Sequence, residues 1–231
     1  MSQQKYRHEL KYIISAAQLP LLQSRISHLM QLDPHAGREG AYNIRSLYFD
    51  DMDNRCFRDN IDGVSPREKF RLRIYNSAAS AVTLECKRKE YGKTLKSSSP
   101  LSPEQAQLLM AGKPLENLPS LPPLQRKISL QIMGRGLHPV VIVDYDRVPY
   151  IYRSGNVRVT FDINLCASSN TERFFDKQVP GYPVMPVGMH LMEVKFDEYL
   201  PDFIYQSLNL GRLQQCSFSK FRLCRELTMI T

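Results

Sequence analysis

The stretch that decides the fold is Arg67-Glu-Lys-Phe-Arg-Leu-Arg-Ile-Tyr75, followed after a turn of small residues by Val82-Thr-Leu-Glu-Cys-Lys-Arg-Lys89. Successive side chains of a strand point to opposite faces, so each segment is predicted to be a strand with one apolar and one charged face. The two strands would form a hairpin. Taken alone, this alternation is also typical of an ordinary strand that shows its polar face to water. The charged positions are Arg71, Arg73, Glu85 and Lys87.

The same charged face recurs on other predicted strands along the chain. An inward charged face is costly unless the charges meet water, one another or a ligand. We therefore expect an α+β fold in which an antiparallel β-barrel forms a charged tunnel, with helices packed on the outside. Barrels of this length are routinely one domain, so a single domain over residues 1–231 is predicted. The recurring positions are Glu9 and Lys11, Arg158 and Asp162, and Glu193 and Lys195.

Composition narrows the class of protein. Lys and Arg number 31 against 23 acidic residues, a net charge of +8, which favours polyanionic partners and also fits a merely basic surface. The five cysteines are widely spaced with no C-x-x-C pair, which indicates neither a zinc site nor a disulfide framework but reduced thiols in a cytoplasmic protein. No secretory signal and no transmembrane span are predicted.

The predicted tunnel would hold more cations than anions, and this excess points to a chain of phosphates as its ligand. Arginine recognises phosphate oxygens through a planar fork, and lysine acts as a point charge. The few carboxylates suit a hard divalent cation, which takes one or two protein carboxylates together with phosphate oxygens. For Glu193, a salt bridge to a neighbouring arginine and metal binding both stay open.

Eight short motifs, in this order, resemble the VTC domain of the triphosphate tunnel metalloenzyme superfamily. That domain is named for the catalytic subunit of the eukaryotic vacuolar transporter chaperone complex, a polyphosphate polymerase. The resemblance covers nearly the whole chain. The motifs are Arg7-His-Glu-Leu-Lys-Tyr12, Ile44-Arg-Ser-Leu-Tyr-Phe-Asp50, Phe70-Arg-Leu-Arg73, Leu84-Glu-Cys-Lys87, Asp146-Arg147, Val157-Arg-Val-Thr-Phe-Asp162, Met192-Glu-Val-Lys195 and Ser219-Lys-Phe221.

The resemblance implies roles for individual residues. The metal, Mn²⁺ or Mg²⁺, would bind Glu193. The superfamily's opening motif is Glu-x-Glu-x-Lys, and Arg7 replaces its first carboxylate here, which weakens a hydrolase interpretation. Lys93 competes with Lys96 for one phosphate-binding position. Catalytic positions fall on Lys11, Arg71, Arg73, Lys87, Arg158 and Lys195, and further phosphate-binding positions on Arg45, Lys96, Arg147 and Lys220.

The activity implied by the resemblance is transfer of the terminal phosphoryl group of ATP to a growing polyphosphate chain inside the basic tunnel. Two alternatives stay open: a metal-dependent triphosphatase acting on inorganic, nucleoside or thiamine triphosphate, and a non-catalytic polyphosphate-binding module. No specific nucleic-acid partner is expected, because aromatic stacking platforms do not alternate with the basic positions. Since no span is predicted, association with a membrane would require a membrane-protein partner.

Overall fold

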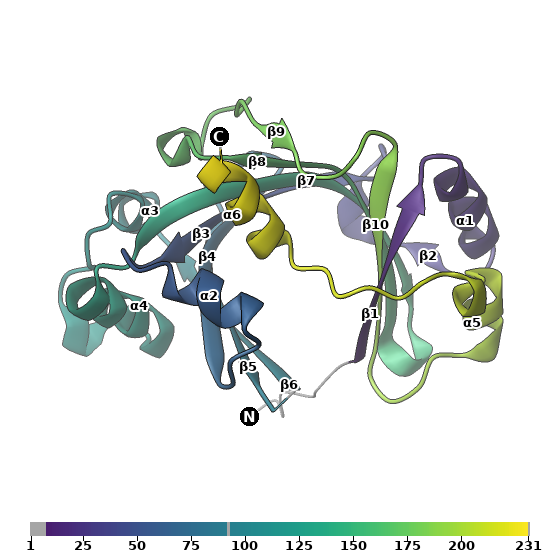
Figure 1. The fold of residues 1–231 in the computed structure, drawn as a ribbon, viewed down its shortest axis with the longest axis horizontal. Helices are drawn as coiled ribbons and strands as arrows, with labels where there is room; N and C mark the ends of the chain where they lie inside the picture. Colours follow the sequence, from purple (N-terminus) through teal and green to yellow (C-terminus); the bar gives the residue numbers. More distant parts are fainter. Residues whose placement is uncertain (1–7, 92, 231) are drawn as a thin grey trace. The chain divides into compact units, whose positions relative to one another are not determined.

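The computed structural model describes residues 8–91 and 93–230, which divide into two compact units. Unit 1 comprises Met1–Asn43, Tyr145–Leu165 and Met185–Phe218, and unit 2 comprises Ile44–Asp144, Cys166–Val184 and Ser219–Thr231. The long strands β7 (His138–Tyr152) and β8 (Val157–Ser168) contribute residues to both units (Figure 1). Arg7, which opens the first motif, lies outside the described residues. A single domain over residues 1–231 stays a prediction.

Unit 1 is built on antiparallel pairing of β1 (His8–Ser15), β10 (Met189–Phe196) and β8. One face is apolar, because Tyr12, Phe161 and Val194 alternate with charged neighbours. This face packs against residues of α1 (Gln18–Ser27) and α5 (Asp202–Ser207), the helices beside β1 in Figure 1. The opposite face carries the charged positions predicted from the sequence. The short β2 (Gln31–Leu32) pairs with β7.

Unit 2 contains an antiparallel run of strands in chain order. Its apolar face carries Leu47, Phe49, Leu72 and Leu84, which form one core with residues of two helices. Because Arg71 and Glu85 alternate with these core residues, they lie on the other face. The strands are β3 (Tyr42–Asp50), β4 (Arg67–Tyr75), β5 (Val82–Glu90) and β6 (Lys93–Leu101), and the helices are α3 (Pro103–Met110) and α4 (Pro123–Arg135).

Local signals in the sequence explain where several helices begin. Ser102 and Gln105 form a capping box at α3, in which each side chain bonds the other residue's backbone N–H. Ser219 Oγ accepts from the backbone N–H of Arg222 and begins α6. The remaining elements are α2 (Arg55–Ile61), α6 (Lys220–Ile230), β9 (Tyr182–Pro183) and the 3-10 turns Pro34–Ala36, Leu118–Ser120, Ser154–Asn156, Thr171–Arg173 and Leu210–Arg212.

The predicted closed barrel is wrong. The strand order is β1-β10-β8-β7-β3-β4-β5-β6, and no pairing joins the two end strands within residues 8–91 and 93–230. The outer edge of β1 is occupied instead by an irregular segment, in which Gln215 bridges Tyr12 and the Cys216 N–H donates to the Lys11 carbonyl at 2.9 Å. Alternating residues specify the two faces of a sheet, but they carry no information on whether its edges meet.

The sequence predicts reduced thiols and no transmembrane span, and the structure can be compared with both predictions. All five cysteines are free thiols. In the part of the chain that the structure describes, none of the helices has the length and apolar character needed to cross a bilayer.

Candidate functional site

One charge cluster of unit 2, the Glu85 cluster, lies on β4, β5 and β6 and consists of Arg71, Arg73, Glu85, Lys87 and Lys96. Glu85 is only 4% exposed. Its Oε2 accepts from Nε and NH2 of Arg71 at 2.8 and 2.5 Å, and NH1 of Arg73 lies 3.7 Å from the same oxygen. Its Oε1 lies 2.7 Å from Nζ of Lys96. One buried carboxylate therefore gathers three of the cations predicted to bind phosphate.

The cations around Glu85 determine its ionisation. Burial alone would raise the pKa of Glu85, but the charges of Arg71, Arg73 and Lys96 outweigh burial and lower the pKa to about 2. The carboxylate is therefore ionised at neutral pH and acts only as a hydrogen-bond acceptor. With Lys87, the cluster has four cations for one carboxylate, so it presents a net positive surface to an anion.

Lys87 and α6 extend this charged face. Lys87 shares a face with Glu85 and lies opposite Lys69 on β4 and Lys96 on β6 in the strand register. The start of α6 packs on the same side of the sheet, because the Phe221 ring lies 5.1 Å from the Tyr48 ring and 5.7 Å from Lys69 Nζ. Lys220 precedes Phe221 and is thereby placed in the first turn of a helix that meets the charged face.

A second cluster, the Glu193 cluster, lies on β1, β7, β8 and β10 of unit 1. Glu193 Oε2 lies 2.9 Å from Lys195 Nζ and 3.5 Å from NH2 of Arg147. Lys11 Nζ lies 3.1 Å from Glu9 and 4.0 Å from Glu193, and it donates to the carbonyl of Phe218 at 2.7 Å. Its cations and carboxylates are equal in number. Its members are Glu9, Lys11, Arg147, Asp162, Glu193 and Lys195.

Arg147 is the most deeply placed cation of the Glu193 cluster. Its Nε and NH2 donate to the two oxygens of Asp162 at 2.6 and 2.8 Å, a bidentate ion pair. Burial would lower the pKa of Arg147, but the Asp162 carboxylate outweighs burial and raises the pKa above its usual range. Asp162 is fully buried, so this pair holds β7 to β8 whether or not Arg147 also meets a ligand.

Arg158 lies on β8 of unit 1 and has partners of its own. Its NH2 donates to Asp33 Oδ2 and to the Tyr42 hydroxyl, each at 2.8 Å. Asp33 also accepts from Nδ1 and the backbone N–H of His35. Burial would raise the pKa of Asp33, but the bonds from His35 and the charge of Arg158 lower it. The predicted cation is therefore held by an ionised carboxylate and a phenol.

Arg45 is the predicted phosphate-binding residue that the structure sets apart from the Glu85 cluster. It alternates with Ser46 and Tyr48 on β3, so it faces the apolar side of unit 2, and it is 3% exposed. Its Nε donates to Asp144 at 2.5 Å, and its NH1 donates to backbone carbonyls of Phe174 and Asp176. These partners indicate that Arg45 ties neighbouring segments to the sheet.

Three residues that sequence reasoning missed contact the predicted cations. Tyr48 accepts from Arg71 NH1 at 2.7 Å, and Tyr42 and Asp33 both bond Arg158. Tyr48 lies directly opposite Arg71 in the pairing of β3 with β4. The sequence alone does not give the register of that pairing. Asp33 follows a two-residue strand that the sequence does not mark.

Glu193 can be tested as a metal ligand by its surroundings. Thr160 lies directly across from Glu193 in the strand register, and its buried Oγ1 has no hydrogen-bond partner among the described residues. In residues 8–91 and 93–230, no three acidic, histidine or cysteine side chains come together as a metal site. Glu193 with Thr160 therefore fits a hard cation that takes most of its ligands from phosphate oxygens.

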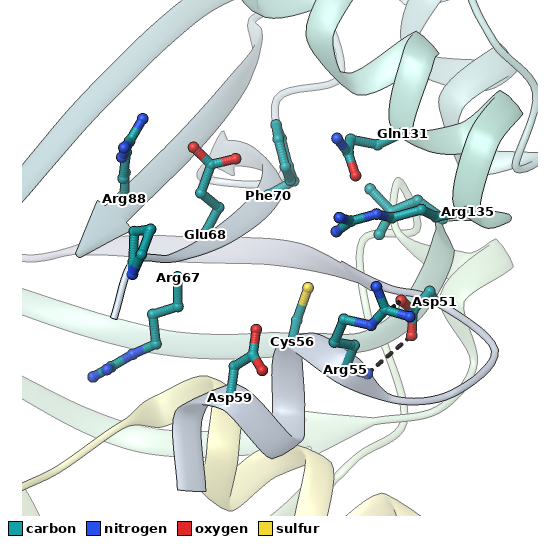
Figure 2. A pocket seen from close by; sticks show the side chains of 12 residues that line it. Asp51, Arg55, Cys56, Asp59, Arg67, Glu68, Phe70, Arg88, Gln131 and Arg135 are labelled. Atoms are coloured by element: carbon teal, nitrogen blue, oxygen red, sulfur yellow. Dashed lines mark hydrogen bonds and ion pairs between the residues drawn. The ribbon is translucent and has the colours of Figure 1, made fainter. Parts of the chain in front are cut away.

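Unit 2 also holds a cavity of about 320 Å³ beside α2, α4 and β4, shown in Figure 2. It is lined by Phe70 and Glu68, which alternate with Arg71, so it lies on the other face of β4 from the Glu85 cluster. Arginines and carboxylates are mixed in its wall, and Arg55 pairs with Asp51 (dashed in Figure 2). The cavity is therefore separate from the candidate site.

Comparison with known protein families identifies the chain. The family model of the VTC domain matches residues 6–229. The chain belongs to the VTC domain family. The match includes both charge clusters, so the clusters are features of this VTC domain and not of an added segment. No curated protein matches the sequence at a significant level.

Solved structures show where the fold of this VTC domain recurs. A candidate adenylate cyclase from Bacillus halodurans is 15% identical with a TM-score of 0.52, and the match covers 93% of this chain and 94% of that one. HpAC1 from Hippeastrum, a candidate adenylyl cyclase described as having a dominant triphosphatase activity, is 14% identical with a TM-score of 0.58, covering 96% and 95%. PH1819 from Pyrococcus horikoshii is 12% identical with a TM-score of 0.50, covering 96% and 99%. At these identities the likeness is one of fold.

Proposed function

We propose that this VTC domain is a metal-dependent polyphosphate polymerase that moves the terminal phosphoryl group of ATP onto the end of a polyphosphate chain. The observation that carries the proposal is the Glu85 cluster, in which Arg71, Arg73 and Lys96 share one buried carboxylate in a member of the VTC family. In the reaction, the bond between the bridging oxygen and the γ-phosphorus of ATP breaks. The terminal oxygen of the chain forms the new bond, and ADP leaves.

Phosphoryl transfer needs positioning and charge neutralisation more than covalent help from the protein. Arg71, Arg73 and Lys96 would bind non-bridging phosphate oxygens and stabilise the negative charge that grows on the departing oxygen. In unit 1, Lys11, Arg158 and Lys195 would bind other phosphate groups in the same way. No protein carboxylate is required as a nucleophile.

Glu193 and Thr160 would hold a divalent cation, Mn²⁺ or Mg²⁺. When bound, the cation would supply positive charge that polarises the phosphate groups of the substrate. Lys195 Nζ and Arg147 NH2 lie within 3.5 Å of Glu193 Oε2 and orient this carboxylate. The carboxylates Glu9 and Asp162 are ion-paired, and this supports transfer over hydrolysis by an acid-rich metal site.

Incubation with ATP and Mn²⁺ or Mg²⁺, followed by gel analysis of polyphosphate, tests the proposal. We expect chain growth with ADP release in the wild type and none with Arg71→Ala or Glu193→Ala. Polyphosphate synthesis at the wild-type rate in either variant would overturn the assignment of these residues. Orthophosphate release from tripolyphosphate without chain growth would instead assign a triphosphatase, and salt-sensitive polyphosphate binding without turnover would assign a binding module.

A further inference from the structure

One predicted phosphate-binding arginine in each unit, Arg71 in unit 2 and Arg158 in unit 1, has a feature that the proposed reaction does not require by itself. Each is held by one carboxylate and one tyrosine hydroxyl. Arg71 bonds Glu85 and the hydroxyl of Tyr48, and Arg158 bonds Asp33 and the hydroxyl of Tyr42. The two tyrosines lie on the same strand, β3, and each is only 7% exposed.

From this repeated arrangement we infer that Tyr48 and Tyr42 are positioning residues, which hold the guanidinium groups of Arg71 and Arg158 in the orientation that binds substrate phosphate. The inference rests on the proposed phosphate-binding role of the two arginines. An arginine side chain has many rotamers, and a planar fork recognises phosphate only when it is correctly oriented. A rigid, buried phenol limits that freedom without adding charge.

At Arg71 the contacts fix the guanidinium plane from two directions. Glu85 accepts from Nε and NH2, while the Tyr48 hydroxyl accepts from NH1 at 2.7 Å. The guanidinium carbon lies 5.5 Å from the centre of the Tyr48 ring, and that ring packs against Phe221. A phenylalanine would keep the ring contacts and lose only the hydroxyl, so the Tyr48→Phe variant isolates the hydrogen bond.

At Arg158 the hydroxyl matters for a different reason. NH2 uses its two N–H bonds on Asp33 and Tyr42, and the buried Nε has no hydrogen-bond partner in the described part of the chain. A buried donor without an acceptor is costly, and a phosphate oxygen would satisfy it. Anchoring NH2 directs the remaining N–H groups toward such an oxygen.

The test compares Tyr48→Phe and Tyr42→Phe with Tyr150→Phe, a control on the apolar side of unit 1 whose ring packs against Phe161. Inorganic tripolyphosphate binding is measured by calorimetry without nucleotide. We expect about tenfold weaker binding for the two β3 variants and a change below about twofold for the control, with unfolding temperatures near the wild type. An unchanged affinity in both β3 variants would overturn the inference.

A double-mutant cycle separates positioning from a general structural effect. If Tyr48 acts through Arg71, Tyr48→Phe will weaken binding in the wild type but not in an Arg71→Ala background. The same holds for Tyr42 with Arg158→Ala. Equal losses in both backgrounds would show that the hydroxyl acts elsewhere, and this outcome would overturn the inference.

A ligand-free measurement keeps failure of the inference distinct from failure of the proposed function. In ¹⁵N-arginine-labelled protein, the signals of the NH1 protons of Arg71, the group that donates to Tyr48, are assigned by their loss in Arg71→Lys. These protons should exchange with water at least about threefold faster in Tyr48→Phe. Unchanged exchange would overturn positioning even if tripolyphosphate binds. Absence of tripolyphosphate binding in the wild type would overturn the phosphate-binding role of the arginines. Faster proton exchange in Tyr48→Phe would still establish that the Tyr48 hydroxyl holds Arg71.

Discussion

Replacing Glu85 with glutamine removes the carboxylate that faces Arg71, Arg73 and Lys96. The folded protein holds the pKa of Glu85 at about 2, below its ordinary value of 4.5, so the ionised carboxylate favours the folded state. That difference corresponds to about 3 kcal/mol of unfolding free energy at neutral pH. The pKa of Glu85 is lower in the folded protein than in the unfolded chain. The contribution of its carboxylate to the unfolding free energy is therefore complete above about pH 4.5 and disappears as the pH falls to about 2.

Urea unfolding monitored by circular dichroism measures this effect between pH 7 and pH 2.5. We expect Glu85→Gln to unfold with about 3 kcal/mol less free energy at pH 7 and to approach the wild type at the acid end. Glu90→Gln is the matched control on the same strand, because the side chains of Glu90 and its ion-pair partner Arg88 are 42% and 41% exposed, so its loss should change stability by less than about 0.5 kcal/mol. Equal stability of Glu85→Gln and wild type at pH 7 would refute this account of the cluster.

Added tripolyphosphate extends the same test to function. If the Glu85 cluster binds phosphate, the ligand supplies the negative charge that Glu85→Gln lacks. A ligand that binds only the folded state stabilises it according to its affinity and concentration. We therefore expect tripolyphosphate to raise the unfolding midpoint of Glu85→Gln more than that of the wild type. An equal rise in both proteins would show that phosphate does not meet these three cations.

Three further predictions concern residues outside the Glu85 cluster. Arg45→Ala should lower the unfolding free energy measured with urea by about 3 kcal/mol, because the partners of a buried guanidinium lose their hydrogen bonds. The same variant should bind tripolyphosphate with an affinity within about twofold of the wild type in calorimetry. Asp162→Ala should cost about 3–5 kcal/mol, because Arg147 would be left buried without its carboxylate; a smaller loss with retained folding would contradict the bidentate pair. Ser102→Ala should lower the unfolding free energy by about 1 kcal/mol through loss of the α3 capping box, and an unchanged midpoint would refute that role.

Much of the fold was predictable because strand alternation is a local property of the sequence. Tyr42–Asp50 and Arg67–Tyr75 are strands in the structure, and Leu47, Phe49 and Leu72 on them belong to the core of unit 2. The starts of α3 and α6 are also local, since Ser102 and Ser219 each bond a backbone group only three residues away. These features require no knowledge of distant contacts.

Sheet closure and the partners of the cations were not predictable from local pattern. Closure depends on which groups occupy the outer edge of β1, and residues 215–216, distant in sequence, occupy it. Arg45 is an example of a cation whose partners the sequence did not predict. It alternates with Tyr48 on β3 and so lies on the apolar face, but only the structure supplies Asp144 and the backbone carbonyls that bind it. The roles of the site residues themselves stay predictions.

The carboxylates that accompany the cations affect how binding of any polyanion would respond to salt. A bare lysine or arginine surface binds polyanions largely by releasing condensed counterions, and affinity then falls steeply as salt rises. In this protein Glu85, Asp33 and Glu193 already serve as built-in counterions for their neighbours. A phosphate that replaces a carboxylate as partner releases no small ion to solution. The plot of log affinity against log salt should therefore be shallower than a count of the cationic side chains implies.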